Sequence, residues 1–267
     1  MRLGASYSVF DSEELLEYSI KSIRKNVDYI SVVYQTVSNH VIPCNEGLVP
    51  LLDALKSQGL IDELVLFEPD LSDMQGNHAS IKETKKRNIG LELSRANGCD
   101  FHLSLDCDEF YTDEQFRYMK DVMEDGYFDV GFCQHRQYYR DSIYQLAVPE
   151  PEYVPTLERI NPDTRYVFMQ PMPVACDPTR GTPNANKKVY IFSRQECEMH
   201  HMSFVRKDIR GKLRSHSSRQ FFTDELIERV SAYYDSWAYP SPAMWAGANL
   251  LDVIEVPRLF EIYPVQK

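Results

Sequence analysis

The chain has 267 residues, of which 43% are hydrophobic and 26% are charged, and its formal net charge is −11 at pH 7. This length fits one large α/β domain with an appendage, or two closely associated domains. The acidic balance argues against general nucleic-acid binding, which needs a basic surface to neutralise phosphates, but it leaves room for a small anionic ligand at a local basic site.

Membrane and disulfide signals are missing from the sequence. No stretch approaches the roughly 18 consecutive apolar residues that a bilayer-spanning helix needs, and the first residues lead into a strand-like pattern without the apolar region of a signal peptide. The six cysteines include no CxxC pair, so zinc-ribbon and thioredoxin-like sites have no support. We therefore expect a cytoplasmic protein, working in solution or at the membrane surface.

The first part of the chain alternates strand-like and helix-like segments. The expected elements are a strand over 3–10, a helix after the capping-box residues 11–14, a strand over 29–37, a helix around 48–55 that Gly59 ends, a strand over 64–67, a helix over 79–97 that Gly98 closes, and a strand over 101–106. Such alternation predicts a doubly wound, mainly parallel sheet, with the ligand site outside the carboxyl ends of the strands.

The pattern becomes less regular toward the carboxyl end. A second capping box at residues 112–115 predicts a helix to about residue 124, and residues 128–134 and 188–192 are typical of strands. Prolines recur between residues 149 and 183, which disfavours long regular elements there, and a further helix is expected over 223–234. We expect this loop-rich half to cover the site.

Asp106 and Asp108 follow the apolar run 101–105, at the carboxyl end of its predicted strand. In extended backbone, alternation places Asp106 and Asp108 on one side and Cys107 on the other, so the two carboxylates can converge on a hard divalent cation. The alternative is a strand that runs into an acidic turn without any ligand.

Residues 200–219 form a basic segment within this acidic chain, and two adjacent histidines, His200 and His201, open it. Its cations suit a diphosphate whose charge a metal neutralises only in part, and the alternative is a solvated basic helix. Neighbouring residues of an extended segment point to opposite faces, so at most one histidine completes a mixed carboxylate and imidazole metal shell of the kind that manganese accepts. We select His201 because it begins the basic run.

Taken in chain order, these features resemble the GT-A glycosyltransferases, in particular the family 2-like members that use nucleotide sugars. Three segments carry the resemblance: the opening strand over 3–10, the helix segment Lys86-Arg87-Asn88-Ile89-Gly90-Leu91, which is similar to an Arg-Asn-x-Gly helix, and Leu105-Asp106-Cys107-Asp108, which looks like a DxD motif. The resemblance covers residues 1–135, and the later histidine with its basic run is a looser match.

The resemblance implies a GT-A fold and a set of site residues. Asp108 would ligate Mn²⁺ or Mg²⁺ together with His201, and Asp106 would complete the metal shell or hold the ribose or a metal-bound water. The nucleotide sugar would contact Val9, Phe10, Asp70, Arg87, Asp106 and Cys107. Residues 1–135 would form the nucleotide-sugar-binding half, 136–222 the acceptor-binding and diphosphate-completing half, and 223–267 a helical and aromatic extension.

The predicted chemistry is set by the negative charge on the departing diphosphate. The metal with Arg206, Lys207, Arg210 or Lys212 would stabilise that charge. An inverting enzyme also needs a carboxylate that deprotonates the acceptor, for which the candidates are Asp177, Glu158 and Glu198. Because the family's Glu-Asp base signature is absent after the DxD strand, both inverting and retaining transfer stay open.

The sequence therefore predicts a metal-dependent glycosyltransferase that moves a sugar from a nucleotide sugar, a UDP-sugar in our interpretation, to a glycan or glycoconjugate acceptor. Tyrosines and tryptophans of the second half would supply stacking faces for the acceptor. One alternative is a sugar-phosphate nucleotidyltransferase, although the glycine-rich basic loop that cradles a triphosphate is missing after the first strand. The other is a non-catalytic carbohydrate-binding or scaffold protein on the same fold.

Overall fold

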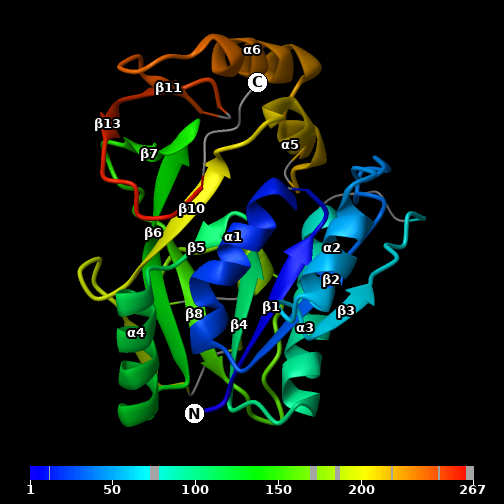
Figure 1. The fold of residues 1–267 in the computed structure, drawn as a ribbon, viewed down its shortest axis with the longest axis vertical. Helices are drawn as coiled ribbons and strands as arrows, with labels where there is room; N and C mark the ends of the chain where they lie inside the picture. The colour runs from blue at the N-terminus through cyan, green and yellow to red at the C-terminus, as the bar shows by residue number, and fades with distance from the viewer. Residues whose placement is uncertain are drawn as a thin grey trace.

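The structure is a computed structural model that describes residues 1–11, 13–72, 78–168, 173–183, 187–217, 219–245 and 247–262. It is a mixed α/β fold around one large twisted sheet (Figure 1). Among the described residues, no helix combines the length and the apolar composition that a membrane crossing requires.

The amino-terminal half of the sheet is parallel, as the sequence predicts. Its strands lie in the order β3-β2-β1-β4, and each neighbouring pair is parallel. Their bounds are β1 (Leu3–Val9), β2 (Tyr29–Tyr34), β3 (Glu63–Leu66) and β4 (Phe101–Asp106), and the intervening helices are α1 (Glu13–Ile23), α2 (Leu48–Ser57) and α3 (His78–Ala96). All seven elements agree with the predicted alternation to within a few residues.

Apolar side chains hold one face of this sheet against three helices. The largest core cluster packs α1, α2 and α4 (Asp113–Asp125) on β1, β2 and β4, with fully buried leucines, isoleucines and phenylalanines at helical and alternating spacing. Gly59 and Gly98 follow α2 and α3 with φ angles of 73° and 70°, the left-handed conformation that glycine adopts without steric cost. The predicted helix ends are confirmed at both glycines.

The helix α3 packs on the other side of β1 through small and polar residues. A Cβ atom added at Gly90 would lie 2.1 Å from Ser6 Oγ and 2.3 Å from Ser6 Cβ, so only glycine permits this close approach. His102 of β4 lies between the two elements, with Nδ1 2.8 Å from Ser94 Oγ and Nε2 3.2 Å from Ser6 Oγ. Because Arg87 lies on the same helix, this contact also fixes the distance of its guanidinium from the end of β4.

The second half extends the sheet with mixed pairing beyond β4. β8 (Tyr153–Arg159) is antiparallel to β4, and β6 (Val130–Tyr139) is antiparallel to β8 and to β7 (Asp141–Leu146). β10 (Glu198–Phe204) and β9 (Val189–Ile191) pair with β6 in parallel, while β5 (Glu109–Phe110) and β13 (Val253–Glu255) pair antiparallel with β10 and β7. The sheet is therefore mainly parallel only in its amino-terminal part.

The expectation of a loop-rich second half requires correction, because it omitted β7, β8 and β10. β8 contains Pro155, which lies opposite Phe132 where the register of the β6–β8 pair shifts. A proline is tolerated at such an irregularity, since no regular ladder hydrogen bond is lost there. β10 is rich in histidine and methionine, and its composition does not have the usual β-branched signature of a strand.

The last elements lie beyond the carboxyl end of β1, where α5 (Ile209–Ser215) and α6 (Asp224–Ser236) form the top of the molecule in Figure 1. Thr223 caps the start of α6, and its hydroxyl accepts a hydrogen bond from Leu226 N at 3.1 Å. The short strands β11 (Ala243–Met244) and β12 (Leu250–Leu251) follow. A second core cluster packs these elements on the ends of β6, β7 and β10.

Candidate active site

A cavity of about 460 Å³ opens at the carboxyl ends of β1, β2 and β4. Ser8 and Phe10 line it from β1 and its following loop, Gln35 from the loop after β2, and residues 106–109 from the end of β4. The second half of the chain completes the wall with segments near 135, 150, 180, 201 and 212. This position agrees with the rule that α/β sheets bind ligands outside the carboxyl ends of their strands.

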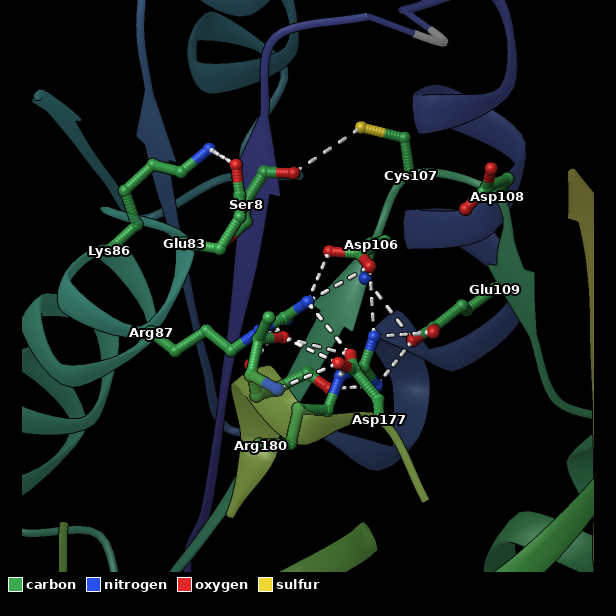
Figure 2. Close-up of polar contacts among 12 residues, drawn as sticks. Ser8, Glu83, Lys86, Arg87, Asp106, Cys107, Asp108, Glu109, Asp177 and Arg180 are labelled. Carbon is green, nitrogen blue, oxygen red and sulfur yellow. Dashed lines mark hydrogen bonds and ion pairs between the residues drawn. The ribbon is translucent and has the colours of Figure 1, made fainter. Parts of the chain in front are cut away.

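Two buried arginines hold Asp106 on the floor of the cavity. Arg87 Nη2 lies 3.0 Å from both carboxylate oxygens of Asp106, and Arg180 Nη2 lies 3.0 Å from Oδ2. Both arginine side chains are only 2% exposed, whereas 36% of the Asp106 side chain faces the cavity. Figure 2 shows the two guanidinium groups converging on this carboxylate.

Two further carboxylates complete this ion-pair cluster. Glu109 accepts hydrogen bonds from Arg180 Nη1 at 2.9 Å and from Nη2 at 2.5 Å. Asp177 Oδ2 lies 3.5 Å from Arg87 Nη2 and 3.2 Å from Arg180 Nε, and its carboxylate also accepts hydrogen bonds from Thr179. The cluster contains three acids and two arginines, so it is close to electrically balanced without any ligand.

The arginines also determine the protonation of Asp106. Burial alone would raise the pKa of its carboxyl group, but the adjacent guanidinium groups of Arg87 and Arg180 hold that pKa below its ordinary value. Asp106 is therefore ionised throughout the physiological pH range. The sequence pointed to Arg87 but not to the roles of Arg180 and Glu109.

Asp108 faces a different set of cations. Arg206 Nη2 lies 2.5 Å from Asp108 Oδ2, and Lys212 Nζ lies 3.5 Å from the same oxygen. Arg206 also pairs with Asp11 at 3.3 Å and donates to Ser203 O at 2.8 Å, so its buried side chain is fully committed to the protein. Burial opposes ionisation of Asp108, but Lys212 and His201 hold its pKa well below the ordinary value.

The two adjacent histidines point to opposite faces of β10. His201 Nε2 lies 3.5 Å from Asp108 Oδ1 and lines the cavity. His200 is buried on the other face, with Nδ1 2.7 Å from the hydroxyl of Tyr138 and its ring against Phe260. The strand alternation thus places His201, and not His200, beside the predicted metal ligand.

Two of the three predicted metal ligands, Asp108 and His201, lie side by side. Octahedral ligands at about 2.1 Å from Mg²⁺ or Mn²⁺ lie about 3 Å apart, which is close to the separation of Asp108 Oδ1 and His201 Nε2. Asp106 does not share this position, since its oxygens are held by Arg87 and Arg180. Asp106, Asp108 and His201 are also not a group whose ligand atoms all approach within 4.8 Å of one another.

The remaining residues that were predicted to contact the nucleotide sugar divide into two groups. Phe10 and Cys107 line the cavity, whereas Val9 is fully buried beside it in the core. Asp70 does not line it; it is exposed after β3, where its carboxylate accepts hydrogen bonds from Ser72. The expectation that Asp70 contacts the nucleotide is therefore not supported by its position.

The predicted diphosphate-binding set also requires correction. Lys212 lines the cavity, and Arg206 lies behind it on Asp108. Arg210 is on the opposite face of α5, where Nε lies 3.0 Å from Glu228, and Lys207 is exposed and does not line the cavity. Arg210 and Lys212 are two positions apart in α5. Residues on the same face of a helix are three or four positions apart, so these two side chains lie on different sides of the helix.

Of the three candidate bases, only Asp177 lines the cavity, and both of its neighbouring arginines pair with it. Glu158 is buried in β8 and bound by Lys187, and burial, opposed by Lys187, raises its pKa to about 7. Both carboxylate oxygens of Glu198 accept a hydrogen bond from Arg136 Nε at 3.0 Å. Neither Glu158 nor Glu198 faces the cavity, so the expectation that one of them is the base is not supported.

Three further cavity residues, which the sequence did not indicate, form a group beside His201. They are His135, Glu150 and Glu152. His135 of β6 has Nε2 3.9 Å from a carboxylate oxygen of Glu150 and 3.9 Å from one of Glu152, and its ring packs edge-on against that of His201. Burial and the neighbouring His201 lower the pKa of His135 to about 3, so its imidazole is neutral. Glu150 and Glu152 lie in a proline-rich segment, and their local sequence pattern did not indicate a site.

Aromatic residues of the second half are mostly structural. Tyr139, Tyr144, Trp237 and Tyr239 pack on one another near α6, and Tyr138 and Tyr166 are buried. Tyr153 and Trp245 line the cavity, and Trp245 stacks on Phe204 with ring centroids 4.0 Å apart. These two are the predicted aromatic residues whose positions allow a contact with an acceptor.

No protein-family profile matches this chain, and no curated protein matches its sequence. Among solved structures, S. aureus TarS 1–349 is similar at 11% identity and a TM-score of 0.48, covering 88% of this chain and 72% of that one. The complex of S. aureus TarS 1–349 with UDP matches at 14% identity and a TM-score of 0.40, over 57% of this chain and 39% of that one. The complex with UDP-GlcNAc has 13% identity, the same TM-score of 0.40, and coverages of 57% and 38%. Because these TM-scores lie below 0.5, we base the functional proposal on the cavity and not on the similarities.

Proposed function

We propose that this protein is a metal-dependent glycosyltransferase that binds a nucleotide-diphosphate sugar in the cavity at the carboxyl ends of β1, β2 and β4. The observation that carries the proposal is the geometry around Asp108, where His201 Nε2 and Lys212 Nζ both face one buried carboxylate at 3.5 Å. A carboxylate, an imidazole and an ammonium group are together the set that a metal-bound diphosphate needs.

The cavity has room for such a donor. Its volume of about 460 Å³ is in the range of sites that enclose small organic ligands. The nucleoside would lie toward Ser8, Phe10 and Gln35, on the side of β1 and β2, and the diphosphate toward Asp108. In our proposal the donor is a UDP-sugar, and the acceptor is a glycan or glycoconjugate hydroxyl.

Lys212 would exchange partners when the donor binds. Its side chain is 17% exposed and reaches Asp108 from the cavity wall, so a phosphate oxygen can replace the carboxylate without a change in α5. Arg206 would keep its contacts with Asp108 and Asp11 and hold the carboxylate in place. Of the two cations, Lys212 is therefore the one that can contact the diphosphate and stabilise its charge as it departs.

A divalent ion on Asp108 and His201 would neutralise charge on the diphosphate as its bond to the sugar breaks. The protein's own side chains supply the remaining interactions. The ion-pair cluster of Arg87, Arg180, Asp106, Glu109 and Asp177 fixes the cavity floor, and Asp106 presents its exposed oxygen edge to the ribose or sugar hydroxyls. A hydroxyl of the nucleotide sugar that donates a hydrogen bond to this carboxylate would orient the ligand without changing the net charge of the ion-pair cluster.

The two rival functions predict different ligand responses. We would screen UDP-, GDP-, CDP- and dTDP-sugars and the free nucleoside triphosphates by thermal shift, each with and without Mn²⁺. The proposal predicts a rise in melting temperature that needs both a UDP-sugar and Mn²⁺. Stabilisation by a triphosphate alone would favour the nucleotidyltransferase, and no metal-linked shift with any nucleotide would favour the scaffold protein.

A further inference from the structure

The glycosyl transfer proposed above needs a group that accepts the proton of the attacking hydroxyl, and the carboxylates around the cavity differ sharply in their ability to do so. Six of them have an arginine or lysine nitrogen within 4 Å, and protonation of a carboxylate held in this way weakens its ion pair. These six are Asp11, Glu83, Asp106, Asp108, Glu109 and Asp177. In the described part of the chain, Glu150 and Glu152 are the cavity carboxylates without such a partner.

From this difference we infer that Glu150 is the proton acceptor for the incoming hydroxyl, a role that rests on the proposed function and deepens it. The hydroxyl proton passes to a carboxylate oxygen of Glu150, and the electron pair that it leaves forms the new bond to the anomeric carbon. The bond between that carbon and the diphosphate oxygen breaks, and its electron pair departs with the diphosphate. A direct displacement of this kind inverts the configuration at the anomeric carbon.

The position of Glu150 suits this role because it lines the same cavity as the proposed diphosphate seat and is separated from that seat by two histidine side chains. Asp108 contacts His201, His201 packs edge-on against His135 with ring centroids 5.8 Å apart, and His135 Nε2 lies 3.9 Å from the Glu150 carboxylate. Two imidazole rings thus separate the carboxylate that would hold the metal from the one that would take the proton. A sugar ring and an acceptor would meet in the cavity beside these two rings, within reach of both carboxylates.

Glu150 is better placed than Glu152 for two reasons. Its side chain is 27% exposed against 64% for Glu152, so it is partly shielded from water. Its backbone is also fixed, since Arg194 Nη2 donates to Glu150 O at 2.5 Å and Arg194 Nη1 donates to His135 O at 3.1 Å. The ion-pair partner of Arg194 is Glu198, at 3.2 Å. Arg194 therefore does not neutralise the Glu150 carboxylate.

The surrounding groups keep this carboxylate basic. Burial and the nearby Glu152 raise the pKa of Glu150, and His201 opposes the rise. A general base works best when its pKa is near the working pH, so a raised value increases its effectiveness. His135, on β6, is neutral and adds no charge to the site.

The same three residues are also a geometrical candidate for a metal, since ligand atoms of His135, Glu150 and Glu152 lie within 4.8 Å of one another. The hydrogen bonding disfavours that role. Gln137 Nε2 lies 3.2 Å from His135 Nδ1, and in this amide orientation it donates to Nδ1, which assigns the proton of the neutral imidazole to Nε2, the atom that faces the glutamates. In that tautomer the Nε2–H group orients a carboxylate and offers no lone pair to a cation.

The test compares Glu150→Gln with Glu152→Gln and with Glu46→Gln, a control on an exposed turn outside the cavity. Because the acceptor is unidentified, the assay is UDP release from UDP-glucose, UDP-galactose and UDP-GlcNAc with Mn²⁺, in which water replaces the acceptor. We expect Glu150→Gln to bind UDP like the wild type and to lose at least about 100-fold in the rate of UDP release. It should also lose the acid limb of the pH–rate profile, while Glu152→Gln stays within about fivefold of the wild type and Glu46→Gln is unchanged.

Several outcomes would overturn this inference. They are a wild-type rate or an unchanged acid limb in Glu150→Gln, a larger loss in Glu152→Gln than in Glu150→Gln, and UDP binding by the wild type without release from any of the three donors. Zn²⁺ or Mn²⁺ binding that survives Asp108→Asn but is lost in His135→Ala would make the triad a metal site, and would also overturn it. Failure of the wild type to bind UDP would instead remove the proposed function on which the inference rests.

Discussion

Replacement of Arg180 by methionine tests whether the buried ion-pair cluster organises the cavity floor. Arg180 is the arginine partner of Glu109, with which it makes two hydrogen bonds, and it also donates to Ser104 O at 3.2 Å. Removing one partner of a buried ion pair costs about 3–5 kcal/mol, because the other charge is left buried and unpaired. Asp106 and Asp177 keep Arg87, so we expect a loss near the lower limit, about 3 kcal/mol.

A double-mutant cycle with Glu109→Gln isolates the pair. Glutamine has nearly the volume of glutamate and no charge, so Arg180→Met in that background should cost clearly less, with a coupling free energy of about 2 kcal/mol. The assay is urea unfolding followed by circular dichroism at pH 7, and the matched control is Arg165→Met at an exposed position. A cost below about 1 kcal/mol for Arg180→Met, or strict additivity of the two substitutions, would refute the reasoning.

Three further predictions concern other parts of the fold. Burial raises the pKa of Glu158 from an ordinary 4.5 to about 7, so the folded state binds the extra proton and the wild type should lose stability as pH rises from about 5 to 8. Relative to Glu158→Gln the loss should approach about 3 kcal/mol, and parallel urea-midpoint profiles for the two proteins would contradict this. Gly90→Ala should destabilise the fold by about 1–3 kcal/mol, because its Cβ would lie 2.1 Å from Ser6 Oγ, and the wild-type melting temperature in that variant would show that α3 can move away from β1. His201→Ala should weaken Mn²⁺ binding measured by calorimetry more than His200→Ala, which should chiefly lower stability through its lost contact with Tyr138, and the reverse order of Mn²⁺ affinities would exclude His201 as the ligand.

Local periodicity was sufficient to predict the amino-terminal half of the fold. The apolar spacing of α1 and α2, the glycines after α2 and α3, and the β-branched run of β2 each specify an element from a short window of sequence. Strand pairing between distant segments carries no such signal. β7, β8 and β10 are positioned by partners across the sheet, and Pro155 in β8 would locally argue against a strand.

In the candidate site, too, local sequence patterns indicated some residues and not others. Asp106 and Asp108 could be located because they end a predicted strand, and His201 because alternation separates it from His200. Arg180 meets Asp106 and Glu109 more than 70 positions away, so no local pattern indicates it. The choice of Lys212 over Arg210 depends on the first residue of α5, which fixes the face that each side chain occupies.

Calorimetric titration of UDP into the wild type and into Asp108→Asn, each with and without Mn²⁺, measures whether Asp108 couples metal binding to nucleotide binding. We expect Mn²⁺ to strengthen UDP binding to the wild type at least about tenfold, which is about 1.4 kcal/mol. The same titration should show no metal-dependent gain in Asp108→Asn. Equal Mn²⁺ dependence in the two proteins would contradict the assignment of Asp108, and no UDP binding by the wild type would contradict the proposed function.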